Sequence, residues 1–237
     1  AGCATPTPEQ KASGEIFDPY ERGNRRMHEF NLALDKALFR PASKGYVHIV
    51  PEPMVDSFNS FADNISMPGN AVDYLLQGRL KESGISLLRF VINSTVGFAG
   101  LADPATEFGI PQVDTDFGET LYVWGFGEGA YLELPFYGPS TTRNAIGVVA
   151  NLFTNPVDFA PTRPIDNLGL YTEIVRRLSD RGRFADTVDS ILYDSADSYA
   201  QARILYLQNR RFDLAGEAND DYLDLYTDPY SIDTEGF

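Results

Sequence analysis

Residues 85–102, ISLLRFVINSTVGFAGLA, constrain the fold most because they form the most apolar stretch of an otherwise acidic chain. A helix that crosses a bilayer needs about 20 mostly apolar residues without charge. This stretch is shorter than that and contains Arg89, Asn93 and two glycines. We therefore predict a helix that is buried in a protein core or embedded in lipid without crossing a membrane.

On a helical projection, the polar and small residues of this region fall on one narrow stripe. The stripe consists of Glu82, Ser86, Arg89, Asn93, Gly97 and Gly100, and the apolar remainder includes Ile85, Leu88, Val91, Ile92, Phe98 and Leu101. Such a stripe is suited to face phosphate or water while lipid tails or a core cover the rest. The other interpretation is a core helix in which Arg89 pairs with an internal carboxylate. Both interpretations stay open, because the hydrophobic periodicity predicts that the helix is buried but not whether protein or lipid covers it.

The charge balance limits the partners of the chain. The net charge is −15, from 34 acidic and 19 basic residues. A nucleic-acid surface needs clustered Lys and Arg, and electrostatic adhesion to an anionic membrane needs the same residues. Both are therefore disfavoured, and any contact with a membrane must be apolar or covalent.

The N-terminal residues predict a covalent lipid anchor. The single cysteine, Cys3, excludes an internal disulfide. Ala1, Gly2 and Cys3 match the end of a bacterial lipobox, in which the cysteine receives acyl chains. Residues 4–14 are rich in Pro, Ser and Thr, which is typical of an extended tether. We expect Cys3 to be lipidated and residues 1–15 to be the lipobox remnant and flexible tether.

Capping residues and prolines divide the first half of the chain into helices. One helix is expected to be capped by Asp18 and to stop before Pro41. A second is expected to begin at residue 51 and to break at Pro68, and a third to follow a cap at Asn70.

The segment 117–139 differs because it combines many aromatic residues with five glycines. It is predicted to form loops with two short extended pieces, LYVW and YLEL, and a compact hairpin is an alternative. Ser140 is expected to cap a helix that ends near residue 154, and residues 155–167 to form a linker. Three helices are expected from 168 to 216. Residues 217–237, which carry seven acidic and no basic residues, are expected to be a disordered tail.

No catalytic or metal-binding motif occurs in the sequence. There is no GxSxG, HExxH, P-loop or dinucleotide fingerprint. His28 and His48 stand on separate segments without cysteine partners, so neither a zinc site nor another cofactor is expected. Glu119, Glu128 and Glu133 are candidates for the acid and base of a carbohydrate-active enzyme. No spacing singles out a pair, and solvated carboxylates are the simpler interpretation.

Five short motifs occur together in the chain: DP-x-E-x-x-NR at 18–25, LQG at 76–78, RF-x-x-NS-x-x-G at 89–97, FG-x-T-L-x-x-WG at 117–125 and LP-x-x-GPS-x-x-R at 134–143. No single motif is specific, but their joint occurrence resembles the MlaA (VacJ) family of outer-membrane lipoproteins. The resemblance covers about residues 16–213.

The resemblance implies a fold and a function that the residue pattern alone does not give. Such proteins are mainly α-helical and form a ring of amphipathic interfacial helices around a narrow channel, in the inner leaflet of the Gram-negative outer membrane. They remove mislocalised phospholipids from the outer leaflet and pass them to a soluble periplasmic carrier, which maintains lipid asymmetry. They associate with trimeric porins and use no cofactor or enzyme chemistry.

Together with the helical projection of residues 82–101, the resemblance leads us to expect the following roles for parts of this chain. The channel and its lipid are expected to contact Ser86, Arg89, Asn93 and Gly97, and the membrane is expected to contact Leu88, Val91, Ile92, Phe98 and Leu101. Within a single domain at 16–216, residues 16–154 are expected to be membrane-embedded and 168–216 to face the periplasm. Two other functions stay open: a porin-binding structural adaptor that moves no lipid, and a periplasmic carbohydrate-active enzyme.

Overall fold

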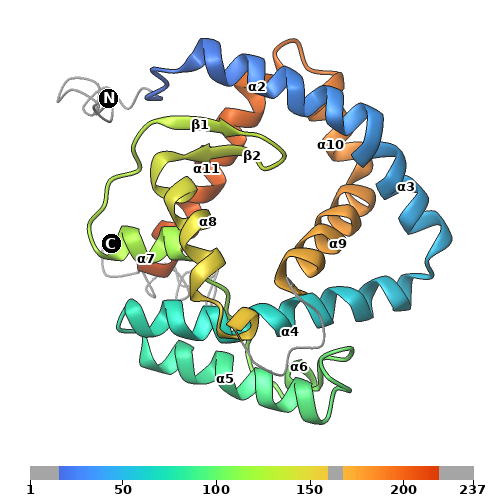
Figure 1. Ribbon diagram of the computed structural model, residues 1–237, viewed down its shortest axis with the longest axis vertical. Helices are drawn as coiled ribbons and strands as arrows, with labels where there is room; N and C mark the ends of the chain where they lie inside the picture. Colours follow the sequence, from blue (N-terminus) through green and yellow to red (C-terminus); the bar gives the residue numbers. More distant parts are fainter. Residues whose placement is uncertain (1–15, 160–167, 219–237) are drawn as a thin grey trace, which may run out of the picture.

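The computed structural model describes residues 16–159 and 168–218. The described chain is mainly helical, which confirms the predicted class, and its elements are arranged around a central opening (Figure 1). The elements are α2 (Glu21–Leu34), η1 (Asp35–Phe39), α3 (Arg40–Ile49), α4 (Glu52–Leu76), α5 (Leu80–Thr95), α6 (Pro104–Glu107), α7 (Phe117–Val123), β1 (Tyr131–Leu134), β2 (Gly138–Thr141), α8 (Thr142–Thr154), η2 (Pro156–Phe159), α9 (Leu168–Arg183), α10 (Ala185–Tyr193) and α11 (Ser198–Ala218).

The first helical stretch runs from α2 through η1 into α3, so the prediction that it stops before Pro41 is wrong. η1 is a π-helical turn, and at its end the Arg40 N–H donates to the Asp35 carbonyl, five residues back. Pro41 lies in the first turn of α3. The π-helical turn just before Pro41 changes the hydrogen-bond register from four to five residues, and the continuous stretch accommodates at this point a residue that lacks an N–H.

Asp18 connects two distant helices. The prediction that it caps α2 is wrong. Its carboxylate accepts hydrogen bonds from Asn24 at 2.8 Å and from Arg203 at 2.6 Å, and a third from the Tyr199 hydroxyl. Tyr20 precedes α2 and makes no side-chain cap. The first motif therefore joins α2 to α11.

α4 is one helix of 25 residues that continues through Pro68, so the predicted break there is wrong. Residues 67–71 are buried, and α4 packs against α5, α8 and α9. Burial of apolar surface on several sides outweighs the one backbone hydrogen bond that a proline removes. Asn70 does not cap a new helix, and its side chain donates to Asp114 at 2.7 Å.

α5 covers only the first part of the apolar stretch. After Thr95 the chain makes a series of turns, in which Phe98, Ala99 and Gly100 have positive φ angles. The helical projection is therefore wrong beyond Thr95. Within residues 16–159 and 168–218, no helix combines the length and the hydropathy that crossing a membrane requires.

α7 occupies the place where the extended piece LYVW was predicted, so that prediction is wrong. The Asp116 carboxylate accepts the Glu119 N–H at 2.9 Å, which is a helix-capping arrangement. The second piece, YLEL, is confirmed as β1, and it pairs antiparallel with β2 so that Leu134 lies opposite Gly138. Gly138 has a φ angle of +86°, which favours glycine over other residues in this tight turn.

The C-terminal half agrees with the sequence more closely. α8 is present, although Thr141 and not Ser140 is its cap and accepts the Asn144 N–H at 3.2 Å. The three expected helices are confirmed as α9, α10 and α11, and the last continues to Ala218. The predicted lipid anchor at Cys3 with its tether, residues 160–167 of the linker and the acidic tail beyond 218 lie outside the described residues.

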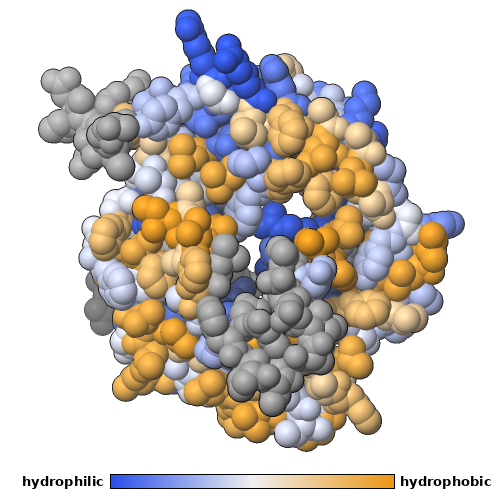
Figure 2. Space-filling view, in the orientation of Figure 1, coloured by the Kyte–Doolittle hydropathy of each residue, from blue (hydrophilic) through white to orange (hydrophobic). Residues whose placement is uncertain are grey.

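Large apolar side chains are exposed over much of the outer surface. Leu80, at the start of α5, is 69 % exposed and Phe98, in the turns after α5, is 80 % exposed, and Val149 and Phe153 on α8 are 57 % and 71 % exposed. Figure 2 shows hydrophobic residues gathered over the lower edge, where α4 and α5 lie, and over the side formed by α7 and α8. Soluble monomers rarely expose apolar patches of more than a few hundred Å².

Candidate functional site

Three adjoining cavities line the central opening, which is visible in Figure 2. The main cavity has a volume of about 700 Å³ and lies among α4, the segment before α7, α8, α9 and α11. The side cavity, of about 220 Å³, shares Ser66, Asn70 and Arg176 with it. The apolar cavity, of about 440 Å³, adjoins the main cavity at Tyr137 and extends to α2, η1 and α10. Together we call these three cavities the lumen.

The wall of the main cavity is polar and carries ion pairs. Arg210, on α11, donates to Asp116 at 2.7 Å. Glu119, on α7, accepts from Arg79 at 3.1 Å and from the Thr115 hydroxyl at 2.8 Å. These contacts join α11, α7 and the turn between α4 and α5 around the cavity, so its charged groups are held by three separate parts of the chain.

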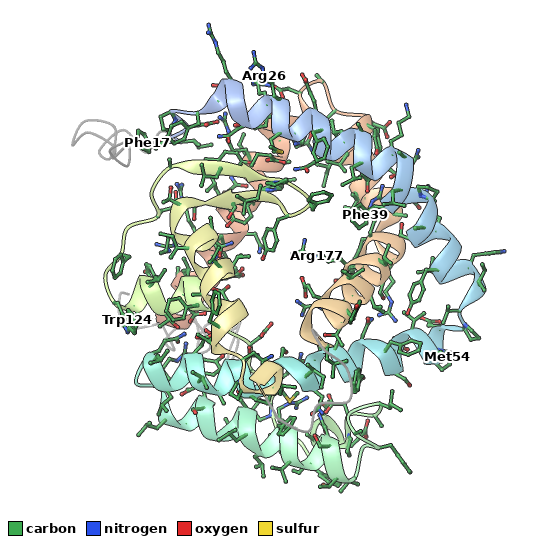
Figure 3. The ribbon with its side chains drawn as sticks, in the orientation of Figure 1. Phe17, Arg26, Phe39, Met54, Trp124 and Arg177 are labelled. Atoms are coloured by element: carbon green, nitrogen blue, oxygen red, sulfur yellow. The ribbon has the colours of Figure 1, made fainter. Side chains whose placement is uncertain are left out.

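Two consecutive arginines on α9 face the lumen. Arg176 and Arg177 both bind Glu173, each at 2.7 Å. The Arg177 guanidinium also lies 4.2 Å from the centre of the Tyr137 ring, a cation–π contact from α9 to the β1–β2 turn. Figure 3 shows Arg177 directed into the opening. Since Tyr137 lines both the main and the apolar cavity, this contact lies at the boundary between them.

The apolar cavity has a different lining. Its walls include Leu32, Leu34, Phe39, Phe136, Val188 and Leu192. Histidine, asparagine and charged side chains also line it, namely His28, Asn31, Asp35, Glu133, Arg177, Asp180 and Arg181. The lumen is therefore amphipathic, because apolar and charged side chains share its walls.

Burial raises the pKa of several carboxyl groups in and around the lumen. Asp73 lines the side cavity, is 2 % exposed, and its Oδ1 has no hydrogen-bond partner in the protein. Burial, together with the charge of Asp116, raises the pKa of Asp73 to about 7. Burial also raises the pKa of Asp114, although the hydrogen bond from Asn70 and the charge of Arg176 each lower that pKa. At neutral pH, Asp73 therefore exists in both protonation states.

The structure places Arg89 away from the lumen, so the expectation that it meets a lipid phosphate in a channel is wrong. Its side chain is 1 % exposed and donates to Asp103 at 2.7 Å, to Thr106 at 3.1 Å and to the Ile110 carbonyl at 2.5 Å. Burial alone would raise the pKa of Asp103, but hydrogen bonds from Thr106 and Asn93 and the charge of Arg89 outweigh it and lower the pKa. The alternative interpretation, a core helix with Arg89 on an internal carboxylate, is the one that the contacts support.

The other stripe residues are also internal. Ser86 is 1 % exposed and Asn93 is 2 % exposed, and the Asn93 amide donates to Asp103 at 2.9 Å and accepts the Ala105 N–H at 3.1 Å. None of these side chains lines the three cavities that form the lumen. Their assignment to the channel is therefore corrected, because the stripe of α5 faces α4 and the turns that follow α5.

Gly97, the fourth channel candidate, is a position of close backbone packing. A Cβ atom there would lie 2.6 Å from the Asn93 carbonyl oxygen and would also collide with the Ala102 carbonyl. We expect Gly97→Ala to lower the free energy of unfolding by about 1–3 kcal/mol, the usual effect of overpacking. Gly84→Ala, on the same segment and with no atom within 4 Å of the added Cβ, is the control and should be neutral or stabilising. Thermal unfolding of both variants measures the difference, and equal melting temperatures would contradict the assignment.

The predicted membrane-facing residues do lie on the surface. Leu88, Val91 and Leu101 are 49 %, 55 % and 44 % exposed, Phe98 is more exposed still, and Ile92 is partly exposed. Leu88 and Val91 lie on a side of α5 that is turned away from the buried Arg89, whereas Phe98 and Leu101 lie in the turns that follow α5, where the projection does not apply. Contact with lipid at these residues stays a prediction.

The three carboxylates considered for an enzyme line different cavities. Glu119 belongs to the main cavity and Glu133 to the apolar cavity, whereas Glu128 lines a separate cavity and binds Arg211 at 2.8 Å. Glu133 is buried, where it accepts from Tyr131 at 2.6 Å and contacts His28 at 3.2 Å. Within the described part of the chain, no three His, Cys, Asp or Glu residues are grouped to hold a metal ion.

Several residues that line the lumen were not predicted from the sequence. On α4 these are Ser66, Asn70 and Asp73, and on α9 Glu173 and Arg176. The three α4 residues are polar positions four and three residues apart in a largely apolar helix, so a helical projection of residues 52–76 could have found them. The predicted break at Pro68 concealed this stripe.

Comparisons with known proteins agree with this architecture. The family model described as MlaA lipoprotein matches residues 16–213. The intermembrane phospholipid transport system lipoprotein MlaA of Escherichia coli (strain K12) is 33 % identical over 215 residues, which is 89 % of this chain and 82 % of that protein. An uncharacterized protein of Rickettsia bellii is 34 % identical over 197 residues, 83 % of this chain and 76 % of its own length. A solved structure that concerns maintenance of bacterial outer membrane lipid asymmetry superimposes with a TM-score of 0.72 at 28 % identity, over 83 % of this chain and 98 % of that one.

Proposed function

The chain belongs to the MlaA lipoprotein family, and we propose that it moves phospholipids through its lumen. Relatives in this family are named for intermembrane phospholipid transport. In this role the protein removes mislocalised phospholipids from the outer leaflet of the outer membrane and hands them to a soluble periplasmic carrier. This activity maintains the lipid asymmetry of the membrane.

The observation that carries the proposal is the amphipathic lumen inside a ring of helices. A phospholipid has a charged headgroup and apolar chains, and each needs its own surroundings to leave a bilayer. The main cavity offers ion pairs and amides, and the apolar cavity offers aliphatic and aromatic walls. A channel with both linings lowers the free-energy cost of moving either end of the lipid.

The exposed apolar side chains support a position in one leaflet. Leu80, Phe98, Val149 and Phe153 form part of an outer surface that lipid chains would cover. A lipidated Cys3 would add a covalent anchor, and more than one acyl chain is needed for stable attachment. We place the protein in the inner leaflet of the outer membrane, beside a trimeric porin and facing the periplasm with α9 to α11.

Ser66→Trp is expected to block transport, because Ser66 lines both the main and the side cavity and an indole would fill the space between them. Ser57→Trp is the matched control. Both serines are on α4 and donate to a backbone carbonyl, at 2.8 Å for Ser66 and 3.0 Å for Ser57, but Ser57 lines none of the three cavities. The measurement is the amount of phospholipid in the outer leaflet of cells that carry each variant at wild-type abundance.

With Ser66→Trp, outer-leaflet phospholipid should rise to the level of a deletion strain, and with Ser57→Trp it should stay at the wild-type level. Normal lipid levels with Ser66→Trp would refute transport through this lumen. If deletion of the gene itself leaves lipid asymmetry intact, the structural-adaptor function would replace the transport function.

A further inference from the structure

We propose that the side cavity and the adjoining wall of the main cavity form a binding site for the headgroup of an ethanolamine-type aminophospholipid. The headgroup ammonium binds the acidic wall that includes Asp73 and Asp114, and the phosphate binds Arg176. This inference rests on the proposed transport function and adds a headgroup preference to it.

The charge on the cavity walls is strongly unbalanced. Among the described residues, six carboxyl groups and two guanidinium groups line the main and side cavities: Asp73, Asp114, Asp116, Glu119, Glu173 and Asp213, against Arg176 and Arg210. Arg79 and Arg177, which bind Glu119 and Glu173 from outside these two cavities, reduce the acidic excess but do not cancel it. Such a wall attracts a cation and repels a net anion, and the effect is strong where water is excluded. A zwitterionic lipid therefore meets a favourable wall, and an anionic lipid such as phosphatidylglycerol does not.

Asp73 supplies an independent sign that a ligand group is missing. It is 2 % exposed and lines the side cavity, and its Oδ1 has no hydrogen-bond partner in the protein. Leaving a buried carboxylate oxygen without a donor costs free energy. An ammonium group in the side cavity brings both a positive charge and N–H donors to the Asp73 carboxyl group. It would also lower the raised pKa of Asp73, because a nearby cation favours the ionised carboxylate.

Arg176 faces the same cavity from α9. Its guanidinium binds Glu173 at 2.7 Å and lies 3.7 Å from Asp63, yet 39 % of the side chain is exposed. A guanidinium has five N–H donors, so groups remain for a phosphate after the contact with Glu173. Because Arg176 and Asp73 line one cavity of about 220 Å³, a cation-binding and an anion-binding group stand within the span of a small zwitterion.

The arrangement also favours a primary ammonium over a quaternary one. Asp73 Oδ1 needs a hydrogen-bond donor, and a trimethylated nitrogen has none. Phosphatidylethanolamine should thus bind more tightly than phosphatidylcholine, and both more tightly than phosphatidylglycerol.

The test uses the full chain in detergent and isothermal titration with dihexanoyl phosphatidylethanolamine and dihexanoyl phosphatidylglycerol below their micelle concentrations. The wild type should bind the ethanolamine lipid at least about tenfold more tightly, a difference of about 1.4 kcal/mol. Asp73→Asn combined with Asp114→Asn should bring this ratio to about one, and Arg176→Ala should weaken binding of both lipids, since both carry the phosphate. Asp186→Asn, which removes an exposed carboxylate outside the lumen, is the control and should keep the wild-type ratio.

Equal affinities in the wild type, or an unchanged ratio in the double variant, would overturn the headgroup site. If the chain moves both lipids equally well in cells while Ser66→Trp still blocks it, transport stands and the preference fails. A chain that binds neither lipid would overturn both proposals.

Discussion

Arg89→Ala is expected to lower the free energy of unfolding by about 3 kcal/mol, near the lower end of the range for breaking a buried ion pair. The guanidinium is 1 % exposed, and its contacts reach Asp103, Thr106 and the Ile110 carbonyl. Alanine leaves a cavity and removes the charge that balances Asp103. Since the Asp103 side chain is itself 29 % exposed, water can compensate part of that loss.

The measurement is thermal or denaturant unfolding in detergent, with Arg26→Ala as the control. Arg26 is exposed on α2 and is directed outward in Figure 3, so its removal should change the stability by less than about 0.5 kcal/mol. Equal stability of Arg89→Ala and the wild type would contradict the buried-pair interpretation. A further consequence concerns transport. Any transport defect of Arg89→Ala should be proportional to the decrease in the amount of folded protein, whereas Ser66→Trp should block transport at wild-type abundance.

Asp73→Asn is expected to make the protein more stable at pH 8 than the wild type, by up to about 4 kcal/mol, since each unit of pKa shift corresponds to about 1.4 kcal/mol. Folding raises the pKa of this carboxyl from 3.8 to about 7, so the folded state holds the proton more tightly than the unfolded state. The stability that this proton provides is complete below pH 3.8 and is lost as the pH rises through about 7. Asparagine does not titrate and keeps the shape of the side chain.

The check is the melting temperature of both proteins from pH 5 to pH 8. The wild type should lose stability across this interval more steeply than Asp73→Asn, although Asp63 and Asp114, whose pKa values are also raised, remain in the variant. The exposed substitution Asp186→Asn should keep the wild-type slope. Identical slopes for Asp73→Asn and the wild type would show that Asp73 is ionised without penalty in the fold.

Secondary structure could be predicted where no tertiary contact opposed the local sequence preference. The strand at β1 and the three helices after residue 168 follow from hydrophobic periodicity. The breaks assigned to Pro41 and Pro68 did not occur, because a π-turn precedes the first and packing on three helices encloses the second. Local rules describe the preference of an isolated segment, and tertiary burial can exceed that preference by several kcal/mol.

The candidate site was predicted on the wrong helix for a similar reason. The sequence showed that α5 has a polar stripe, and it allowed either a channel or a core carboxylate opposite Arg89. Both α4 and α5 have such stripes, and only the packing decides which stripe meets protein and which meets the lumen. In this fold Arg89 meets Asp103, and Ser66 and Asn70 meet the cavity.

The sequence by itself determined the mainly helical class, the acidic charge, the shortness of the apolar stretch at 85–102 and, through five joint motifs, the family. These depend on composition and on short-range order, which the chain carries wherever it folds. Only the tertiary structure decided which polar residues surround the lumen. The packing of the helices in the ring determines which face of each helix contacts protein and which face lines the lumen. The acidic wall at Asp73 and Asp114 forms because α4, α8, α9 and the segment before α7 meet there. These segments are far apart in the sequence, so no local sequence pattern predicts that they meet.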